Sequence, residues 1–270
     1  MGRQVTVAPD ARTRESGYAP AVPSAGFAPF GLAHLAILAA VPAAALLLAR
    51  LVRARPGRER SVRWAFAAAL LVNQVAYVAF AAGRGWIDPP RGLPLELCDV
   101  ALWLAVAALL GARAWAGEAL WFFALAGTTQ ALVTPDLGAP FPSYPTVKFF
   151  LGHGGTVAAA LFLAFAGRLR PRRGAWWRAL LGVNAYAAAL LAFNLAAGTN
   201  YMYLRAKPAA PSLLDALGPW PWYLVACEGI AAAAFFALEL PFRVGKKKAA
   251  PGHGFPGAAP SPSSGSVTRR

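Results

Sequence analysis

Long apolar runs separated by short polar gaps dominate the pattern of this chain. A helix needs about 20 residues to cross the roughly 30 Å hydrocarbon core of a bilayer. Seven apolar runs reach or approach that length, at about residues 31–52, 64–83, 94–111, 116–133, 147–167, 175–198 and 219–242. We therefore expect an all-α fold, a polytopic membrane bundle of seven transmembrane helices.

The composition supports this interpretation. Of 270 residues, 58% are hydrophobic and only 14% are charged, a balance that a soluble domain of this size could not keep off its surface. Residues 1–30 and 243–270 are rich in Pro, Ser, Gly and charge, which is typical of disordered tails. The first tail lacks the basic start and short apolar core of a cleaved signal peptide. The transmembrane domain is expected to cover residues 31–242.

The positive charges in the gaps predict the orientation. Short cytoplasmic loops carry an excess of Lys and Arg. The N-terminal segment and every second gap after it hold 8 Lys and Arg in all. The other gaps, together with the C-terminal segment, hold 18. We expect this second side to be cytoplasmic, with the N-terminus outside and the C-terminus inside, in a multi-pass protein of the cell membrane.

The same charges do not indicate a nucleic-acid partner. There are 26 Lys and Arg against 11 Asp and Glu, but they fall in gaps between apolar runs, not on one polar face. The two cysteines, Cys98 and Cys227, both lie inside apolar runs, so a disulfide framework of the secreted type is not expected.

One stretch breaks the apolar pattern at the outer end of the third run. It reads "LPLELCDVALW" and contains Glu96, Cys98 and Asp99. His153, in "FFLGHGGT", lies at a similar depth in the fifth run, within about 10 Å of the outer boundary. A thiol becomes a nucleophile when a nearby imidazole takes its proton. Structural roles stay open: carboxylates that cap a first turn, a small buried thiol and a hydrogen-bonding His.

Other polar groups are also candidates for function. Gln130 ends the fourth run, and Glu228 lies in the middle of the last run. The long outer segment 199–218 begins "GTNYMYLRAKP", where aromatic rings and adjacent cations suit a lipid headgroup held by Arg205. We expect this segment to fold back over the cavity that holds the thiol and the imidazole.

Several stretches together resemble the YwaF-type family of bacterial integral membrane proteins. They are "LPLELCD", "ALAGTTQALVTPDL", "KFFLGHG", "GTNYMYLRAKPAAPSLLDALGPWPWY" and "LELPF", and the resemblance covers about residues 60–242. That family is similar to the eukaryotic transmembrane protein 164 group, which the resemblance implies are thiol-dependent acyltransferases acting on phospholipids, ether lipids among them. The resemblance maps the active Cys and His of that group onto Cys98 and His153 and assigns no role to Glu96 and Asp99.

The sequence therefore predicts an integral membrane thiol-dependent acyltransferase or acyl hydrolase that acts on membrane phospholipids at the outer leaflet. Cys98 would be the nucleophile and His153 the base, without a cofactor or a metal. The expected substrate-binding residues are Glu96, Asp99, Gln130, Asn200, Tyr201, Arg205 and Glu228.

Two alternatives remain open at this point. The first is a small-solute transporter or a lipid-binding membrane protein without catalysis, in which Glu96, Asp99, His153 and Glu228 line a path. The second is a metal site that adds His34 to the thiol and its neighbours. The metal site is the less favoured, because the sequence offers no closely spaced pair of ligands.

Overall fold

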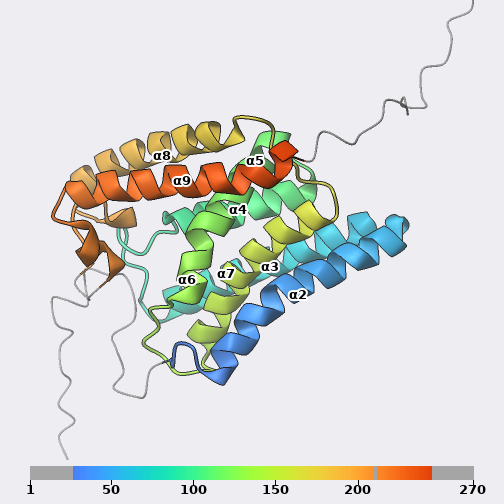
Figure 1. Cartoon of the computed structure of the whole chain (residues 1–270). Helices are drawn as coiled ribbons and strands as arrows, with labels where there is room; N and C mark the ends of the chain where they lie inside the picture. The colour runs from blue at the N-terminus through green and yellow to red at the C-terminus, as the bar shows by residue number, and fades with distance from the viewer. Residues whose placement is uncertain (1–26, 209–211, 245–270) are drawn as a thin grey trace, which may run out of the picture.

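The computed structural model describes residues 27–208 and 212–244, and this part of the chain is helical throughout its regular structure (Figure 1). The α-helices are α2 (Leu32–Ala54), α3 (Glu59–Gly83), α4 (Leu97–Leu110), α5 (Ala114–Phe122), α6 (Thr129–Val133), α7 (Tyr144–Phe165), α8 (Ala175–Ala197) and α9 (Trp222–Val244). The shorter elements are a π-helix, η2 (Phe123–Thr128), and three 3₁₀ turns, η1 (Pro56–Arg58), η3 (Tyr201–Tyr203) and η4 (Leu213–Leu217). The all-α prediction is confirmed.

Five of these helices are long and apolar enough to cross a membrane, namely α2, α3, α7, α8 and α9. The third predicted run forms only the 14-residue α4, about 21 Å long. The fourth run is divided into α5, η2 and α6. The Thr128 and Thr129 hydroxyls donate to the carbonyls five residues earlier, at 3.4 and 3.1 Å, in keeping with the wider π turn.

The gaps between helices collect at two ends of the bundle (Figure 1). The arginine-rich end comprises residues 55–58, 111–113 and 166–174; there Arg53 donates to the Phe165 carbonyl, which ties α2 to α7. The loop end comprises residues 84–96, 134–143 and the described part of 198–221. Gaps that the charge count assigned to one side of the membrane therefore lie at one end of the structure.

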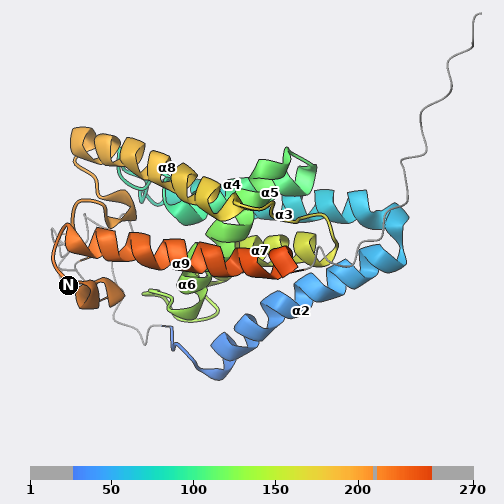
Figure 2. The same cartoon turned by 45° about the horizontal axis from the view of Figure 1, so that its top comes forward.

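Helix α7 is the central helix, and more than half of its residues are buried. Small residues allow close packing: a Cβ on Gly154 would lie 3.0 Å from the Val41 side chain, and one on Gly155 would lie 2.7 Å from Leu70. Glycine at these two positions lets α2 and α3 approach the backbone of α7. Helices α8 and α9 contact each other on the part of the bundle away from α2, and they meet the other helices mainly through α5 and η2 (Figures 1 and 2).

The predicted tails lie almost entirely outside the described residues. At the N-terminal boundary, residues 27–30 already belong to the packed structure. The Phe27 ring is buried and lies 5.3 Å from the His34 ring and 5.1 Å from the Phe150 ring, centroid to centroid. The packed domain therefore begins a few residues before the boundary expected from hydropathy.

Candidate active site

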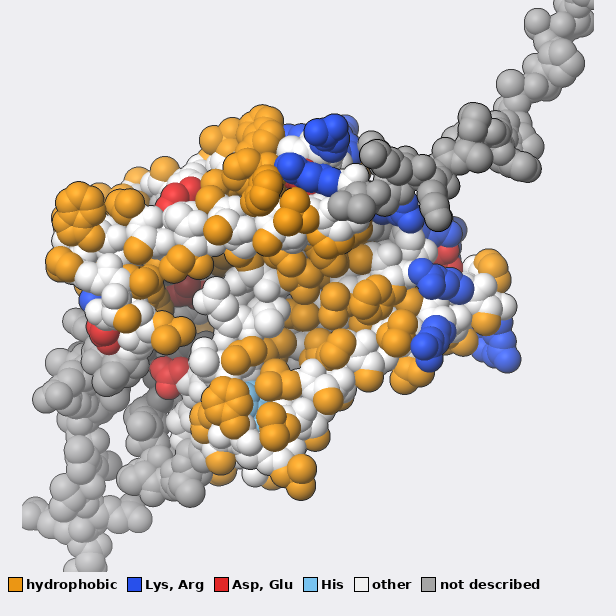
Figure 3. Space-filling model, in the orientation of Figure 1, with side chains coloured by type: hydrophobic (Ala, Val, Ile, Leu, Met, Phe, Trp, Pro, Cys, Tyr) orange, Lys and Arg blue, Asp and Glu red, His pale blue; other side chains and the backbone are white. Residues whose placement is uncertain are grey.

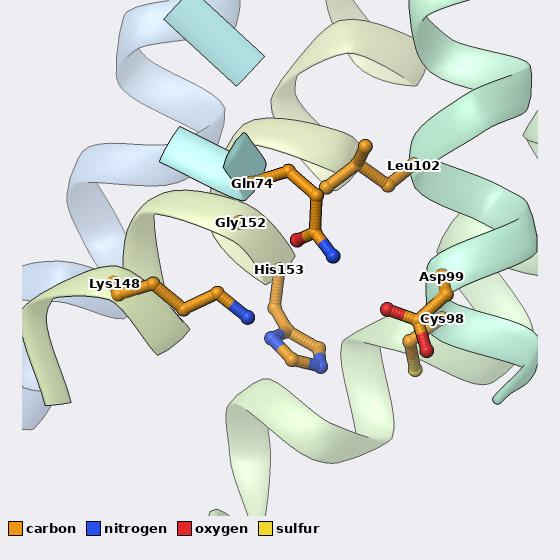
Figure 4. A pocket seen from close by; sticks show the side chains of 7 residues that line it. All are labelled: Gln74, Cys98, Asp99, Leu102, Lys148, Gly152 and His153. Atoms are coloured by element: carbon orange, nitrogen blue, oxygen red, sulfur yellow. The ribbon is translucent and has the colours of Figure 1, made fainter. Parts of the chain in front are cut away.

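A small cavity lies between α3, α4 and α7 near the loop end (Figure 4). Its volume is about 20 Å³, enough for one water molecule. It is lined by Gln74 from α3, by Cys98, Asp99 and Leu102 from α4, and by Lys148, Gly152 and His153 from α7. The structure thus brings together the predicted thiol, the predicted imidazole and one of the two predicted carboxylates.

The start of α4 fixes the position of the thiol. Glu96 is the N-cap and forms a capping box with Asp99, in which the Glu96 N–H donates to Asp99 Oδ2 at 3.1 Å. The Glu96 carboxylate also accepts the Met202 N–H at 3.0 Å, so it joins α4 to η3. Glu96 therefore has a structural role and does not line the cavity, whereas Cys98, two residues further on, does.

Hydrogen bonding determines which nitrogen of His153 is free. His153 Nδ1 lies 2.9 Å from the Phe149 carbonyl oxygen, and the ring stacks on the Phe149 ring with centroids 4.1 Å apart. A carbonyl oxygen only accepts, so Nδ1 carries the hydrogen and Nε2 keeps its lone pair. In Figure 4, this nitrogen points towards Cys98 and Asp99. The imidazole therefore presents its unprotonated nitrogen to the cavity.

Two polar groups that line the cavity were not among the site residues expected from the sequence. The Lys148 ammonium reaches into the cavity and lies 3.8 Å from the centroid of the Tyr77 ring. The buried amide of Gln74 lines the cavity from α3. The sequence signal that could have revealed the lysine is its place inside an apolar run, because ionisable residues in membrane helices usually face the bundle interior and have a function.

Comparison with known families identifies the relatives of the chain. The family model described as the TMEM164 family matches residues 29–239, which include every helix from α2 to α8 and most of α9. The chain belongs to the TMEM164 family. No curated protein and no solved structure matches it. Family membership and five long apolar helices together show a multi-pass membrane protein. The YwaF-type name rests on the quoted motifs alone.

Two predicted substrate-binding residues of this TMEM164-family chain lie away from the cavity. The Gln130 amide donates to the Ala126 carbonyl of its own helical segment at 2.9 Å. Glu228, on α9, accepts a hydrogen bond from the Asn184 amide on α8 at 2.8 Å. Neither side chain lines the cavity. Gln130 is bonded within its own helical segment, and Glu228 lies between α8 and α9.

The predicted loop residues hold the loop itself in place. The Tyr201 hydroxyl accepts the Leu93 N–H and donates to the Pro90 carbonyl, both at 2.8 Å. Arg205 donates to two backbone carbonyls at the end of α8, at 3.0 and 3.2 Å, and its N–H donates to the Asn200 side chain at 2.9 Å. The loop packs against the segment that precedes α4, and none of its described residues, 199–208 and 212–218, lines the cavity.

His34 has a structural environment. It is fully buried, its Nε2 lies 2.7 Å from the Leu132 carbonyl, and its Nδ1 accepts the Phe30 N–H at 2.8 Å. Both ring nitrogens are therefore used to join the start of α2 to the end of α6. Within residues 27–208 and 212–244, no three His, Cys, Asp or Glu side chains come close enough together to hold a metal ion.

Proposed function

We propose that this chain is a thiol-dependent acyltransferase or acyl hydrolase that acts on membrane phospholipids. The observation that carries the proposal is the arrangement of His153: its Nδ1–H is bound to a backbone carbonyl, and its free Nε2 faces the cavity that Cys98 also lines. A thiol and a fixed, neutral imidazole at one buried site are the parts that nucleophilic acyl transfer requires.

In the first step, Cys98 Sγ attacks the carbonyl carbon of a phospholipid ester while His153 Nε2 takes the thiol proton. The tetrahedral intermediate collapses by breaking the bond from the carbonyl carbon to the glycerol oxygen, and the imidazolium returns the proton to that oxygen. A lysophospholipid leaves, and the acyl chain stays on Sγ as a thioester. Water or the hydroxyl of a second lipid then attacks the thioester carbonyl while His153 Nε2 takes its proton. The bond from the carbonyl carbon to Sγ breaks, the imidazolium returns the proton to Sγ, and a fatty acid or an acylated lipid leaves.

The neighbours of the pair supply the electrostatics. The Lys148 ammonium and the Asp99 carboxylate line the same cavity from α7 and α4, so each offsets the cost of burying the other's charge. The ammonium is the group best suited to stabilise the oxyanion of the intermediate, because it is cationic and fixed at the cavity wall.

The transporter alternative receives less support from the structure. A path lined by carboxylates, as in this alternative, needs available carboxylates towards both ends of the bundle. At the arginine-rich end, the buried carboxylates of Glu118 and Glu239 already accept several N–H bonds each, from arginines and from the backbone. These two carboxylates are therefore not available to a solute. Three of the four residues in the transporter alternative, Glu96, Asp99 and His153, lie near the loop end.

A trapped intermediate tests the enzymatic proposal. The protein in nanodiscs is given phosphatidylcholine of defined acyl chains, quenched in acid and weighed by intact mass spectrometry. We expect a one-acyl adduct that neutral hydroxylamine removes, together with lysophospholipid in the lipid extract. Cys98→Ser should lose both, and Cys227→Ser, which removes the other free thiol, should keep both. Unchanged lysophospholipid release by Cys98→Ser would exclude the thiol mechanism.

The membrane topology is part of the proposal. Seven spans, with the loop end outside and the C-terminus in the cytoplasm of the cell, place the cavity at the outer leaflet. The collection of the Lys- and Arg-rich gaps at one end supports this orientation. A cysteine at Gly138 should react with an impermeant thiol reagent added to intact cells, and one at Gly57 should not, in a background without Cys98 and Cys227. The opposite labelling pattern would invert the topology.

A further inference from the structure

A second, larger cavity lies at the arginine-rich end, where the start of α3, the end of α4 and the segment after α7 meet. Its volume is about 470 Å³, within the range of small-ligand pockets. Figure 3 shows Lys and Arg side chains gathered at this end of the molecule. The charged part of the cavity wall consists of Glu59, Arg60, Arg63 and Arg168, so two positive charges are in excess.

Two of these arginines are held by neighbouring groups. Arg63 donates to the Leu109 carbonyl at 2.8 Å and to the Ala108 carbonyl at 3.1 Å, which fixes its guanidinium at the end of α4. Arg168 pairs with Glu59. Glycine at position 111, where φ is +93°, ends α4 and leaves room beside the Arg63 guanidinium. The guanidinium groups at the cavity wall are therefore positioned in advance of any ligand.

Arg60 differs from the other two. Among the described residues it pairs with no carboxylate, and its guanidinium lies 5.5 Å from the centroid of the Trp64 ring. Trp64 and Leu110 also line the cavity, and their side chains are 53% and 45% exposed. The cavity thus has a basic wall and an apolar wall that faces the surroundings of the bundle. Tryptophan in such a position is typical of the membrane interface.

We propose that this cavity binds an anionic phospholipid, with the headgroup phosphate on the arginines and the acyl chains along Trp64 and Leu110. Arginine binds phosphate through paired N–H donors, and two excess charges favour an anionic headgroup over a zwitterionic one. A free phosphate would satisfy the arginines but would leave the apolar wall without a ligand. The site is separate from the thiol cavity and does not depend on acyl transfer.

Native mass spectrometry of the detergent-solubilised full chain tests this proposal. The protein is titrated with short-chain phosphatidylglycerol, with phosphatidylcholine of the same chains, and with glycerol 3-phosphate as the soluble phosphate. The key variant is Arg60→Gln, because this guanidinium donates to no backbone carbonyl within residues 27–208 and 212–244. Arg58→Gln is the matched control, since it removes the same charge two residues away and does not line the cavity. Circular dichroism and the melting temperature check that each variant is folded.

We expect phosphatidylglycerol to bind more tightly than the other two probes, and Arg60→Gln to weaken its binding about fivefold to tenfold. Arg58→Gln should stay within about twofold of the wild type, because loss of a solvated charge outside the cavity removes no direct hydrogen bond. Equal binding of the two lipids, or equal losses for the two variants, would overturn the site. Glycerol phosphate binding as tightly as the lipid would overturn the role of the apolar wall.

Discussion

Glu239 near the arginine-rich end and Asp99 near the loop end are both carboxylates between packed helices, but their partners differ. Glu239 is fully buried and accepts two backbone N–H bonds at the start of α8, at 2.9 and 3.0 Å, and one from Arg243 at 2.7 Å. Asp99 accepts one backbone N–H bond, from Glu96, and otherwise faces the cavity that Lys148 also lines. One carboxylate is saturated with donors, and the other keeps acceptor capacity free.

The same contrast extends to the neighbours of each group. Glu118 is 6% exposed, and its carboxylate accepts the backbone N–H of Arg172 at 2.9 Å. It also accepts two N–H bonds from the Arg172 guanidinium, at 2.7 and 3.0 Å. His153, in the loop-end cavity, has only Nδ1 bonded, to its own helix. Saturated polar groups hold the loops of the arginine-rich end, whereas groups with free capacity can exchange protons or bind substrate. The comparison predicts that mutations at the two ends will affect different properties.

The largest expected effect is the loss of activity in Cys98→Ala. Without the sulfur, no thioester forms, so we expect lysophospholipid release to fall at least about a thousandfold. The melting temperature should change little, because the thiol makes only weak hydrogen bonds. The measurement is lysophospholipid release from nanodiscs alongside thermal unfolding. A large loss of stability with partial activity would show that the thiol is structural.

The next effect is expected for His153→Gln. Removing the base should lower the rate of acyl transfer about a hundredfold to ten-thousandfold, while the glutamine can still donate to the Phe149 carbonyl and fill the site. His34→Gln serves as the matched histidine control, and it should reduce stability more than catalysis because both of its ring nitrogens hold the fold. If His34→Gln lost activity and His153→Gln lost only stability, His34 and not His153 would be the base.

Glu239→Ala probes the saturated carboxylate. We expect the free energy of unfolding to fall by about 3 kcal/mol, because the start of α8 and Arg243 lose their acceptor inside the bundle. Denaturation in detergent, followed by circular dichroism, measures the change. Glu228→Ala, on the same helix but with one partner, Asn184, should cost less than about 1 kcal/mol. Similar losses of unfolding free energy in both variants would show that the number of hydrogen-bond donors around a carboxylate does not determine its contribution to stability.

The smallest effect concerns the loop. Arg205→Ala should lower the free energy of unfolding by about 1 kcal/mol, since its guanidinium caps the carbonyls at the end of α8. Lys207→Ala should change it by less than about 0.5 kcal/mol, because the lysine pairs with the exposed Asp215 at 3.5 Å and lies 5.8 Å from the centroid of the Tyr223 ring, both weak contacts. The affinity for phospholipid, measured in detergent at low salt, should be the same for both variants as for the wild type. If only lipid affinity fell, Arg205 would be a headgroup ligand.

The sequence by itself determined the long apolar helices and the grouping of the gaps at two ends of the bundle. Apolar runs predicted at 31–52 and 175–198 became α2, Leu32–Ala54, and α8, Ala175–Ala197, because length and hydropathy are local properties of the chain. It also placed Cys98 and His153 at one depth, since depth follows from the distance along each helix. The division of the fourth run into α5, η2 and α6 escaped this reasoning, because the π turn depends on side-chain bonds to the backbone.

Only the tertiary structure decided which helix faces meet. Whether a side chain points into a cavity depends on the rotation of its helix about the axis, and that rotation is set by packing against neighbours. Packing turned Lys148 and Gln74 towards the thiol and left Gln130 and Glu228 with partners elsewhere. It also paired groups as distant in sequence as Glu118 and Arg172, through contacts that no local pattern contains.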